Sequence, residues 1–383
     1  MIYVSKSDII ADIKSYFNRN RMIVLSHKIK IIPTVKQDKY FRRACGTSRF
    51  AYNWGLSEWK RQYKSGLKPS TLTVKKAFNA IKPIEFPWVF KVTKCAPEQA
   101  FTDLGTAFQR FFKHQGKYPK FKKKGIHDSF YLSNDQFKLD GFKIRIPKLG
   151  WVRLSENLRF SGKILSATVS RVADHWFVSI SVQLKSIQTI TKNQGDACGV
   201  DLGIKNLATL SNGEMIAGPK PLKRLSGKLA KMQRHLAKCT KGSKRYYKYR
   251  IKLARLHYRI QCIRQDSLHK LTNKLCRSYK IICLENLNVK GMMKNHKLAK
   301  AISDIGFHEF KRQIEYKSKL FDNWISIVDR WFPSSKTCSN CGSVKTELQL
   351  SQRTYSCDHC GIKLDRDINA ALNIKAEGIR LLA

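Results

Sequence analysis

Four cysteines near the C-terminus constrain the fold most strongly, because they come as two pairs that each enclose two residues. Cys338 and Cys341 form the first pair, and Cys357 and Cys360 follow after 15 intervening residues. Two residues between thiolates let both sulfurs reach one ion about 2.3 Å away, and a second such knuckle completes a tetrahedral shell. The spacing therefore predicts one structural Zn²⁺ site with no open coordination position.

Two disulfides or a redox-active cysteine pair are the alternatives to a zinc site, and the redox compartment of the protein decides between them. The chain has 11 cysteines, an odd number. Its first apolar run is interrupted by Asp8, Asp12 and Lys14, which is not typical of a signal peptide. We therefore expect reduced thiols in a cytoplasmic, nucleoid-associated protein. Cys198 and Cys283 lie within apolar runs and are expected to be small core residues.

Charge is the second constraint. The 383 residues include 74 Lys and Arg against 27 Asp and Glu, a net charge of +47. Such an excess repels itself unless a polyanion lies nearby, so nucleic acid is the expected partner and an anionic membrane is the alternative. No apolar run approaches about 18 residues, which excludes a transmembrane span. A hydrophobic content of 42% excludes disorder as the overall state, and the length predicts two or three domains.

Two segments concentrate the positive charge. In residues 113–124 lysines alternate with Tyr118 and Phe121, which suits phosphate contacts and base stacking, although a solvated charged turn is the alternative. Residues 215–265 contain 16 Lys or Arg and no acid, and their apolar residues keep helical spacing. An ordinary exposed helix would mix both signs, so this predicts a basic helical hairpin over 219–275 with one face packed and the other on phosphates. The candidate nucleic-acid-binding side chains are Lys120, Lys122, Lys123, Lys124, Lys223, Arg224, Lys228, Lys231, Arg234, Lys244, Arg245, Arg250, Arg255 and Arg259.

Hydrophobic periodicity places a helical segment between an N-terminal strand and a group of short strands. A strand begins at Met22, helical spacing follows over residues 33–124, and apolar and polar residues then alternate over 126–187. The Asp140-Gly141 pair indicates a hairpin turn within that group. An antiparallel barrel or meander is the expected arrangement.

The C-terminal half alternates strands and helices. A strand containing Asp201 is followed by a tight turn at Asn212-Gly213, and after the basic hairpin an apolar strand ends at Glu285. A helix is expected over residues 299–321, then a strand before the four cysteines. A short last helix is opened by the residues around Asp365.

Carboxylates are the remaining chemical signal. Asp201 lies inside an apolar strand, Glu285 lies at the end of another, and Asp365 and Asp367 open a helix. Buried carboxylates are unfavourable unless a cation compensates them, and a pair of Mg²⁺ ions about 3.5–4 Å apart would do so and could cleave a phosphodiester. The alternatives stay open: Asp367 as a charge at a helix start, and Glu285 as the partner of a lysine.

These motifs occur in a recognisable order: GVDLGIKNLATL with Asp201, ICLENLNV with Glu285, the four cysteines, and DRDINAALNI with Asp367. GTSRFAYN at 46–53, IPKLGWVRL at 146–154, DSLHKLT at 266–272 and ISDIGFHEFKRQIEYK at 302–317 accompany them. In all of these the sequence resembles the TnpB (OrfB) family of insertion-sequence transposons, compact relatives of type V CRISPR effector nucleases. The resemblance covers residues 22–378 approximately, which leaves residues 1–21 outside it as an N-terminal extension.

The resemblance implies a mixed α/β and α+β fold. It implies a RuvC-type, RNase H-like nuclease domain in two parts, residues 195–331 and 362–383, with a zinc ribbon inserted at 332–361. It also implies an N-terminal lobe over 22–187, in which a β-barrel is interrupted by a helical recognition segment at about residues 36–125.

The same resemblance implies an activity. The family's catalytic acids fall on Asp201, Glu285 and Asp367, which would hold two Mg²⁺ ions, with Asp365 as a supporting acid and one Zn²⁺ on the cysteines. The implied activity is RNA-guided cleavage of double-stranded target DNA, with a guide RNA derived from the transposable element. The sequence does not fix the oligomeric state, and a monomer is the default expectation. The alternatives are a DNA transposase or transposition accessory protein that acts directly on element ends, and a non-catalytic nucleic-acid-binding regulator.

Overall fold

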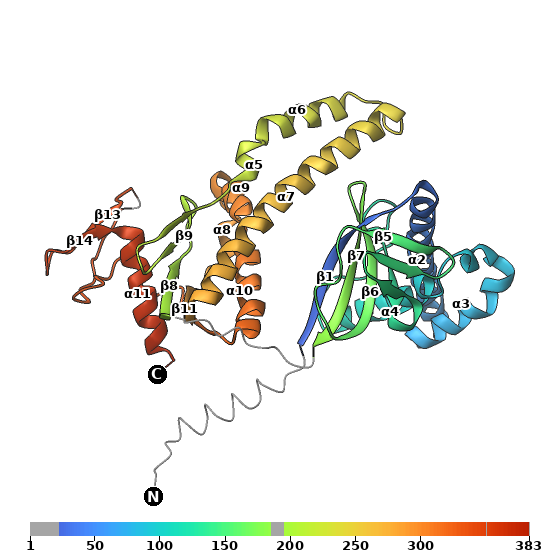
Figure 1. The fold of residues 1–383 in the computed structure, drawn as a ribbon, viewed down its shortest axis with the longest axis horizontal. Helices are drawn as coiled ribbons and strands as arrows, with labels where there is room; N and C mark the ends of the chain where they lie inside the picture. The colour runs from blue at the N-terminus through green and yellow to red at the C-terminus, as the bar shows by residue number, and fades with distance from the viewer. Residues whose placement is uncertain (1–22, 185–194, 350, 383) are drawn as a thin grey trace, which may run out of the picture. The chain divides into compact units, whose positions relative to one another are not determined.

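The computed structural model describes residues 23–184, 195–349 and 351–382, and the chain divides into two compact units after residue 187 (Figure 1). The expected N-terminal extension, residues 1–21, lies outside the described residues. Within those residues no helix has the length and apolar character that a membrane span needs.

Unit 1 is built on a seven-stranded antiparallel sheet with the order β2-β6-β7-β1-β5-β4-β3. Its strands are β1 (Ile23–Ile32), β2 (Ser129–Ser133), β3 (Lys138–Asp140), β4 (Lys143–Ile146), β5 (Gly150–Leu154), β6 (Lys163–Val172) and β7 (His175–Leu184). The strand at Met22 and the hairpin at Asp140-Gly141 are thereby confirmed, the former from Ile23 onward. The hydrogen-bond order ends at β2 and β3, so closure into a barrel stays a prediction.

Three strands of this sheet, β1, β4 and β5, alternate between a buried and an exposed face. Ile29 and Ile31 of β1, Ile144 of β4 and Val152 of β5 are each at most 1% exposed and belong to one core. Because successive side chains of a strand point to opposite faces, the residues between them lie on the outer face. The core therefore lies on one side of β1, β4 and β5 and leaves their other side open.

Helices of unit 1 are inserted between β1 and β2. They are α2 (Val35–Lys64), α3 (Thr71–Glu85), the 3-10 helix η1 (Pro87–Lys91) and α4 (Cys95–Phe112), and a short 3-10 helix η2 (Asn134–Gln136) follows β2. A capping box of Thr34 and Gln37 starts α2, whose predicted apolar stripe is buried. The helical pattern predicted up to residue 124 ends earlier, at Phe112, since Gly116 and Pro119 are poor helix formers in the segment that follows.

Unit 2 is built on a mixed five-stranded sheet with the order β10-β9-β8-β11-β12. The strands are β8 (Gly195–Asp201), β9 (Asn206–Leu210), β10 (Met215–Ala217), β11 (Tyr279–Glu285) and β12 (Trp324–Val328). The first three are antiparallel, whereas β8, β11 and β12 run parallel. The predicted tight turn joins β9 to β10, with Gly213 at φ +89°.

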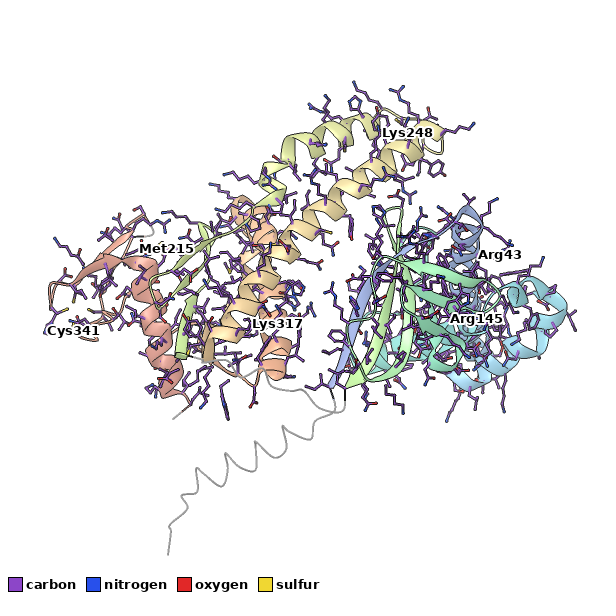
Figure 2. The ribbon with its side chains drawn as sticks, viewed as in Figure 1. Arg43, Arg145, Met215, Lys248, Lys317 and Cys341 are labelled. Carbon is purple, nitrogen blue, oxygen red and sulfur yellow. The ribbon has the colours of Figure 1, made fainter. Side chains whose placement is uncertain are left out.

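The basic hairpin predicted for residues 219–275 is present as α5 (Pro221–Arg224), α6 (Ser226–Ala237) and α7 (Lys244–Ser278). Its outer half projects from the sheet of unit 2, and Lys248 lies near its tip (Figures 1 and 2). The predicted packed face is present but only half-buried in this outer half: Leu229, Met232 and Leu236 of α6 are half-buried, and full burial on α7 begins at Leu256. Two helices with no third layer cannot bury a stripe fully.

The remaining elements of unit 2 are α8 (Val289–Met292), α9 (His296–Ile305), α10 (Phe307–Phe321), the antiparallel pair β13 (Thr354–Ser356) and β14 (Lys363–Asp365), and α11 (Arg366–Arg380). The single helix predicted over residues 299–321 is two helices, broken at Gly306, whose φ of +82° lies in the left-handed region.

Two glycines let α11 lie directly on the sheet. A Cβ atom at Gly199 of β8 would lie 2.0 Å from the carbonyl oxygen of Ala371, and one at Gly378 of α11 would lie 2.4 Å from the sulfur of Cys283. Cys198 and Cys283 are both fully buried, as predicted for core residues. The opposite face of the sheet packs on α7 and α10, so α11 closes the second face.

Replacing Gly199 by alanine is therefore predicted to destabilise unit 2 by about 3 kcal/mol, because the clash is with backbone that cannot move without displacing α11. Gly227 in α6 is the matched control, since an added Cβ there meets nothing within 4 Å and alanine favours helix. Urea unfolding measures the free energy of unfolding of the two variants and the wild type. Equal stability of G199A and G227A would contradict this account of the packing.

Candidate active site and metal centre

The close packing of α11 fixes where the predicted acids lie. Side chains two residues apart on a strand share a face, so Asp201 points to the same side as Gly199, toward α11. On the helix, Asp367 lies one turn before Ala371 and shares its face. Two strand residues span about 6.6 Å and four helix residues about 6 Å, so the two carboxyl groups arrive at the same level.

Glu285 completes the group from the neighbouring parallel strand. Leu284 of β11 pairs with Val200 of β8, so Glu285 follows in register beside Asp201 at the carboxyl edge of the sheet. Cys283, two residues earlier, faces Gly378 of α11, which places Glu285 on the same face. Three acids distant in sequence are thereby brought to one end of α11.

The first turn of α11 adds the fourth predicted acid in a different role. The carboxylate of Asp365 accepts hydrogen bonds from the backbone N–H of Asp367 (2.8 Å) and of Ile368 (3.3 Å), which makes it the N-cap. Arg366 lies 3.6 Å from the Asp367 carboxylate. The helix N-terminus and this guanidinium both favour negative charge at the acids.

Burial and mutual repulsion oppose that charge. Burial, followed by the nearby carboxylates of Asp367 and Glu285, raises the pKa of Asp201 to about 7. Burial also raises the pKa of Glu285, and a hydrogen bond with Ser334 partly offsets this shift. At Asp201, burial and the neighbouring carboxylates outweigh the positive charge of Arg366, which is the condition that a divalent cation relieves.

The donor chemistry fits a hard divalent cation, since carboxylate oxygens are the ligands that Mg²⁺ and Ca²⁺ take in proteins. The three carboxylates do not converge on one point: in the part of the chain that the structure describes, only the four cysteines form a group of three or more such ligands that could hold one ion. Acids spread along an edge suit ions about 3.5–4 Å apart better than a single ion.

The cysteines are brought together as their spacing predicted. All four sulfur atoms lie within 4.8 Å of one another, with Cys338 to Cys360 and Cys341 to Cys357 both at 3.6 Å. Four ligands at about 2.3 Å from one tetrahedral centre lie about 3.8 Å apart, so the observed separations fit a metal with thiolate ligands. Figure 2 shows Cys341 at the outer end of this module, residues 332–361.

Two asparagines that the sequence analysis gave no role connect this module to α11. The Asn369 side chain donates to the carbonyl of Thr337 (2.7 Å) and accepts from the N–H of Ser339 (2.9 Å). Asn373, one turn later, donates to the carbonyls of Ser334 (2.8 Å) and Thr337 (2.6 Å). Both amides are buried. The sequence signal that could have identified them is two asparagines four residues apart, and so on one helix face, among apolar residues. Polar side chains on a buried face need hydrogen-bond partners.

The candidate nucleic-acid contacts lie outside this cluster. Ten of them, all on α5, α6 and α7, are exposed on the basic hairpin. Lys120, Lys123 and Lys124 are exposed in the irregular segment after α4. Lys122 differs, because its ammonium group lies 3.6 Å from Asp103 and 4.1 Å from the ring centre of Tyr52. Its charge is partly compensated within the protein.

Comparison with known proteins places the chain in a family. The family profile OrfB of IS605, described as "Probable transposase", matches residues 175–296, and the "Cas12f1-like, TNB domain" profile matches residues 307–374. A profile described as a helix-turn-helix domain matches residues 22–68, a segment that contains β1 and α2 in this structure. A Streptomyces pristinaespiralis protein named "Putative RNA-guided DNA endonuclease" is 37% identical over 361 residues, 92% of this chain and 89% of that protein. The chain belongs to the TnpB (OrfB) family. The resemblance stated from the motifs is thus confirmed.

Other members and one solved structure agree with this placement. The Escherichia coli K12 protein named "Putative RNA-guided DNA endonuclease InsQ" is 29% identical over 374 residues, 93% of this chain and 92% of that protein. A structure titled as the Cas12f1-sgRNA-target DNA complex superposes with a TM-score of 0.59 at 16% identity, covering 90% of this chain and 83% of that chain. The TnpB chain therefore shares the mixed α/β fold of that protein.

Neutralising Asp201 is predicted to stabilise the protein. Without divalent ions, Asp201→Asn relieves burial and repulsion of a carboxylate, so the free energy of unfolding at pH 8 is expected to rise by about 1–3 kcal/mol. The pH dependence follows from the raised pKa of Asp201. Its ionisation lowers the free energy of unfolding of the wild type progressively between about pH 4 and pH 7, and below about pH 4 this loss is absent. Urea unfolding at pH 5 and pH 8 checks this. A variant less stable than wild type at pH 8 would contradict it.

Loss of one asparagine link is predicted to loosen the four-cysteine module. Asn373→Ala leaves the buried carbonyl of Ser334 without this donor, at a cost of about 1–3 kcal/mol. The expected result is faster loss of the bound metal to a chelator and lower stability. Glu377→Gln is the control, since Glu377 on the same helix only pairs with Arg380 at the surface. Identical metal release from both variants would refute the link.

Proposed function

We propose that this chain is an RNA-guided DNA endonuclease that hydrolyses phosphodiester bonds at Asp201, Glu285 and Asp367. The observation that carries the proposal is the meeting of these three acids beside the N-terminus of α11. Its relatives in Streptomyces pristinaespiralis and Escherichia coli are named for this activity, and they align over nearly the whole chain. The acids are all present, as a nuclease requires.

The finer architecture follows from the same reasoning. The mixed sheet β10-β9-β8-β11-β12 with α11 on one face supports a RuvC-type, RNase H-like domain over residues 195–331 and 362–383. The four-cysteine module at 332–361 is then its zinc ribbon, since thiolates 3.6 Å apart suit Zn²⁺. In the N-terminal lobe, residues 22–187, the seven-stranded sheet would close as a barrel, interrupted in sequence by the helical insert at about residues 36–125.

The residues of the site divide the catalytic work. When two Mg²⁺ ions are bound, they would activate the attacking water and stabilise the leaving oxygen. Asp201, Glu285 and Asp367 supply the oxygen ligands, and the packing of α11 on Gly199 fixes their spacing. Asp365 caps α11 and thereby holds the backbone of Asp367 in place. Its role is supporting, because one of its carboxylate oxygens, Oδ1, accepts both capping hydrogen bonds.

The basic surfaces supply the nucleic-acid partners. The exposed Lys and Arg of the hairpin would hold the sugar-phosphate backbone of a heteroduplex formed by an element-derived guide RNA and the target strand of double-stranded DNA. The exposed lysines at 120, 123 and 124 would contact further phosphates. We propose a cytoplasmic, nucleoid-associated protein on the grounds of charge and reduced cysteines, with a monomer as the default oligomeric state.

A second candidate is a DNA transposase that acts on element ends, which the "Probable transposase" description of the matching family profile favours. The two activities differ in product, because a transposase leaves joined strands and a nuclease leaves broken ones. The same acids would serve both reactions, so their geometry does not separate them.

The test is to purify the chain expressed with its native flanking DNA, sequence the RNA that accompanies it, and offer a DNA target complementary to that RNA. A discrete RNA and Mg²⁺-dependent cleavage of the matched target alone are expected. Alanine at Asp201 or Glu285 should reduce cleavage at least about a hundredfold, with nucleic-acid binding retained. Asp196→Ala is the control, because Asp196 is an exposed acid of β8 outside the cluster.

Two results would overturn the proposal. Cleavage by D201A at the wild-type rate would remove the site assignment. Heterogeneous RNA together with joined rather than broken DNA ends would favour the transposase.

A further inference from the structure

Unit 1 carries a pocket that none of the predicted contacts uses. It has a volume of about 570 Å³ and opens on the outer face of β4 and β5 beside the start of α2. Its lining residues are Ile32, Thr34, Gln37, Phe142, Lys143, Trp151, Val152 and Arg153. The volume exceeds that of a nucleobase and its sugar, so a nucleotide would fit.

The pocket exposes large apolar side chains. Trp151 is 44% exposed, Phe142 54% and Ile32 48%, whereas Val152, next to Trp151 on the same strand, is 1% exposed. A single exposed apolar residue needs no explanation, but two aromatic rings and an isoleucine in one concave site indicate a ligand. Aromatic rings of this kind give nucleobases a surface on which to stack.

Like charges face each other across the same strands. Lys143 of β4 lies directly opposite Arg153 of β5, and Lys138 of β3 lies opposite Arg145 of β4, which Figure 2 labels. Within the described residues none of these four side chains forms an ion pair with an acid, although Asp140 lies opposite Lys143 in register. Directly opposed like charges destabilise a sheet, and an anion between them removes that cost.

The site is held in shape by α2. The side-chain amide of Gln37 donates to the carbonyl of Trp151 (2.9 Å), and the Tyr40 hydroxyl donates to the carbonyl of Pro147 (2.8 Å). The N–H of Leu154 donates to the carbonyl of Phe142 (2.7 Å). These bonds fix the backbone on both sides of the pocket, so a ligand would meet a preformed site.

We propose that this pocket binds an unpaired nucleotide of a single strand, with its base against Trp151 and Phe142 and its phosphate between Lys143 and Arg153. The inference deepens the proposed function and rests on it for the class of partner, nucleic acid. It is independent of the three acids and of the basic hairpin, which belong to unit 2. An unpaired strand suits the site better than a duplex, because only an unstacked base can expose its face to an aromatic ring.

The test measures binding of 12-nucleotide single strands, one RNA and one DNA of the same sequence, to the full chain without added Mg²⁺. Trp151→Ala is expected to weaken binding roughly fivefold or more, as loss of one stacked base does, and Trp151→Phe should restore most of it. The double variant Lys143→Ala, Arg153→Ala should lower the slope of log affinity against log salt by about 0.7, one phosphate contact. A 5-iodouridine in the strand should crosslink to Trp151 or Phe142.

Matched variants control for general surface effects. Tyr63 is 74% exposed outside the pocket, so Tyr63→Ala tests loss of an exposed aromatic ring, and Lys64→Ala, Lys68→Ala tests loss of two exposed charges. Neither should change affinity more than about twofold. If Trp151→Ala weakens binding of both RNA and DNA, the pocket recognises the base and the phosphate alone. If it weakens binding of RNA only, the pocket also recognises the 2′-hydroxyl. Either result supports binding of a nucleotide in the pocket.

Unchanged binding by Trp151→Ala, or an equal loss for a blunt duplex of the same length, would overturn the proposal. Crosslinks confined to unit 2 would overturn it as well. Because the assay requires neither guide nor cleavage, its failure is distinct from failure of the proposed endonuclease activity, which the Asp201→Ala cleavage assay measures separately.

Discussion

The approach of α11 to β8 is the contact on which the rest of unit 2 depends. Gly199 leaves no side chain between the strand and the backbone of Ala371, so the helix rests on the sheet itself. That contact sets Asp367 level with Asp201, brings Glu285 in from the next strand, and presents Asn369 and Asn373 to the four-cysteine module. The first two turns of α11 therefore join the acids to the four-cysteine module, because Asp367 lies in the acidic cluster while Asn369 and Asn373 bond to the module.

Electrostatics explains why the pKa values of Asp201 and Glu285 are raised in a protein of net charge +47. Most of the positive charge lies on exposed side chains, where water and bound polyanions screen it. Inside the cluster, burial and neighbouring carboxylates dominate, which is why the pKa of Asp201 rises to about 7 despite the overall positive charge. Distant lysines cannot replace a cation at the site, since their field is attenuated over the Debye length.

Much of this arrangement could be predicted from the sequence, and the remainder depends on tertiary contacts. Cysteine spacing sufficed to predict the four-cysteine cluster. Apolar runs placed Asp201 and Glu285 on strands, with Glu285 at a strand end; Asp201, expected inside its strand, is the last residue of β8. The break at Gly306 was missed because a single glycine inside an apolar helical pattern is often tolerated, and only its left-handed φ of +82° shows that it ends α9. The pocket at Trp151 was missed because strand pairing, not sequence distance, brings Arg153 opposite Lys143.

The most direct test of the central claim is to locate the divalent-ion site chemically. Fe²⁺ can replace Mg²⁺ at carboxylate ligands and, with ascorbate and peroxide, cuts the nearby backbone, and mass spectrometry then maps the cuts. We predict cuts beside Asp201, Glu285 and Asp367 that Mg²⁺ competes away and that are absent in Asp201→Asn. Cuts elsewhere, or cuts at these positions that persist in Asp201→Asn, would contradict a metal site built by the packing of α11 on β8.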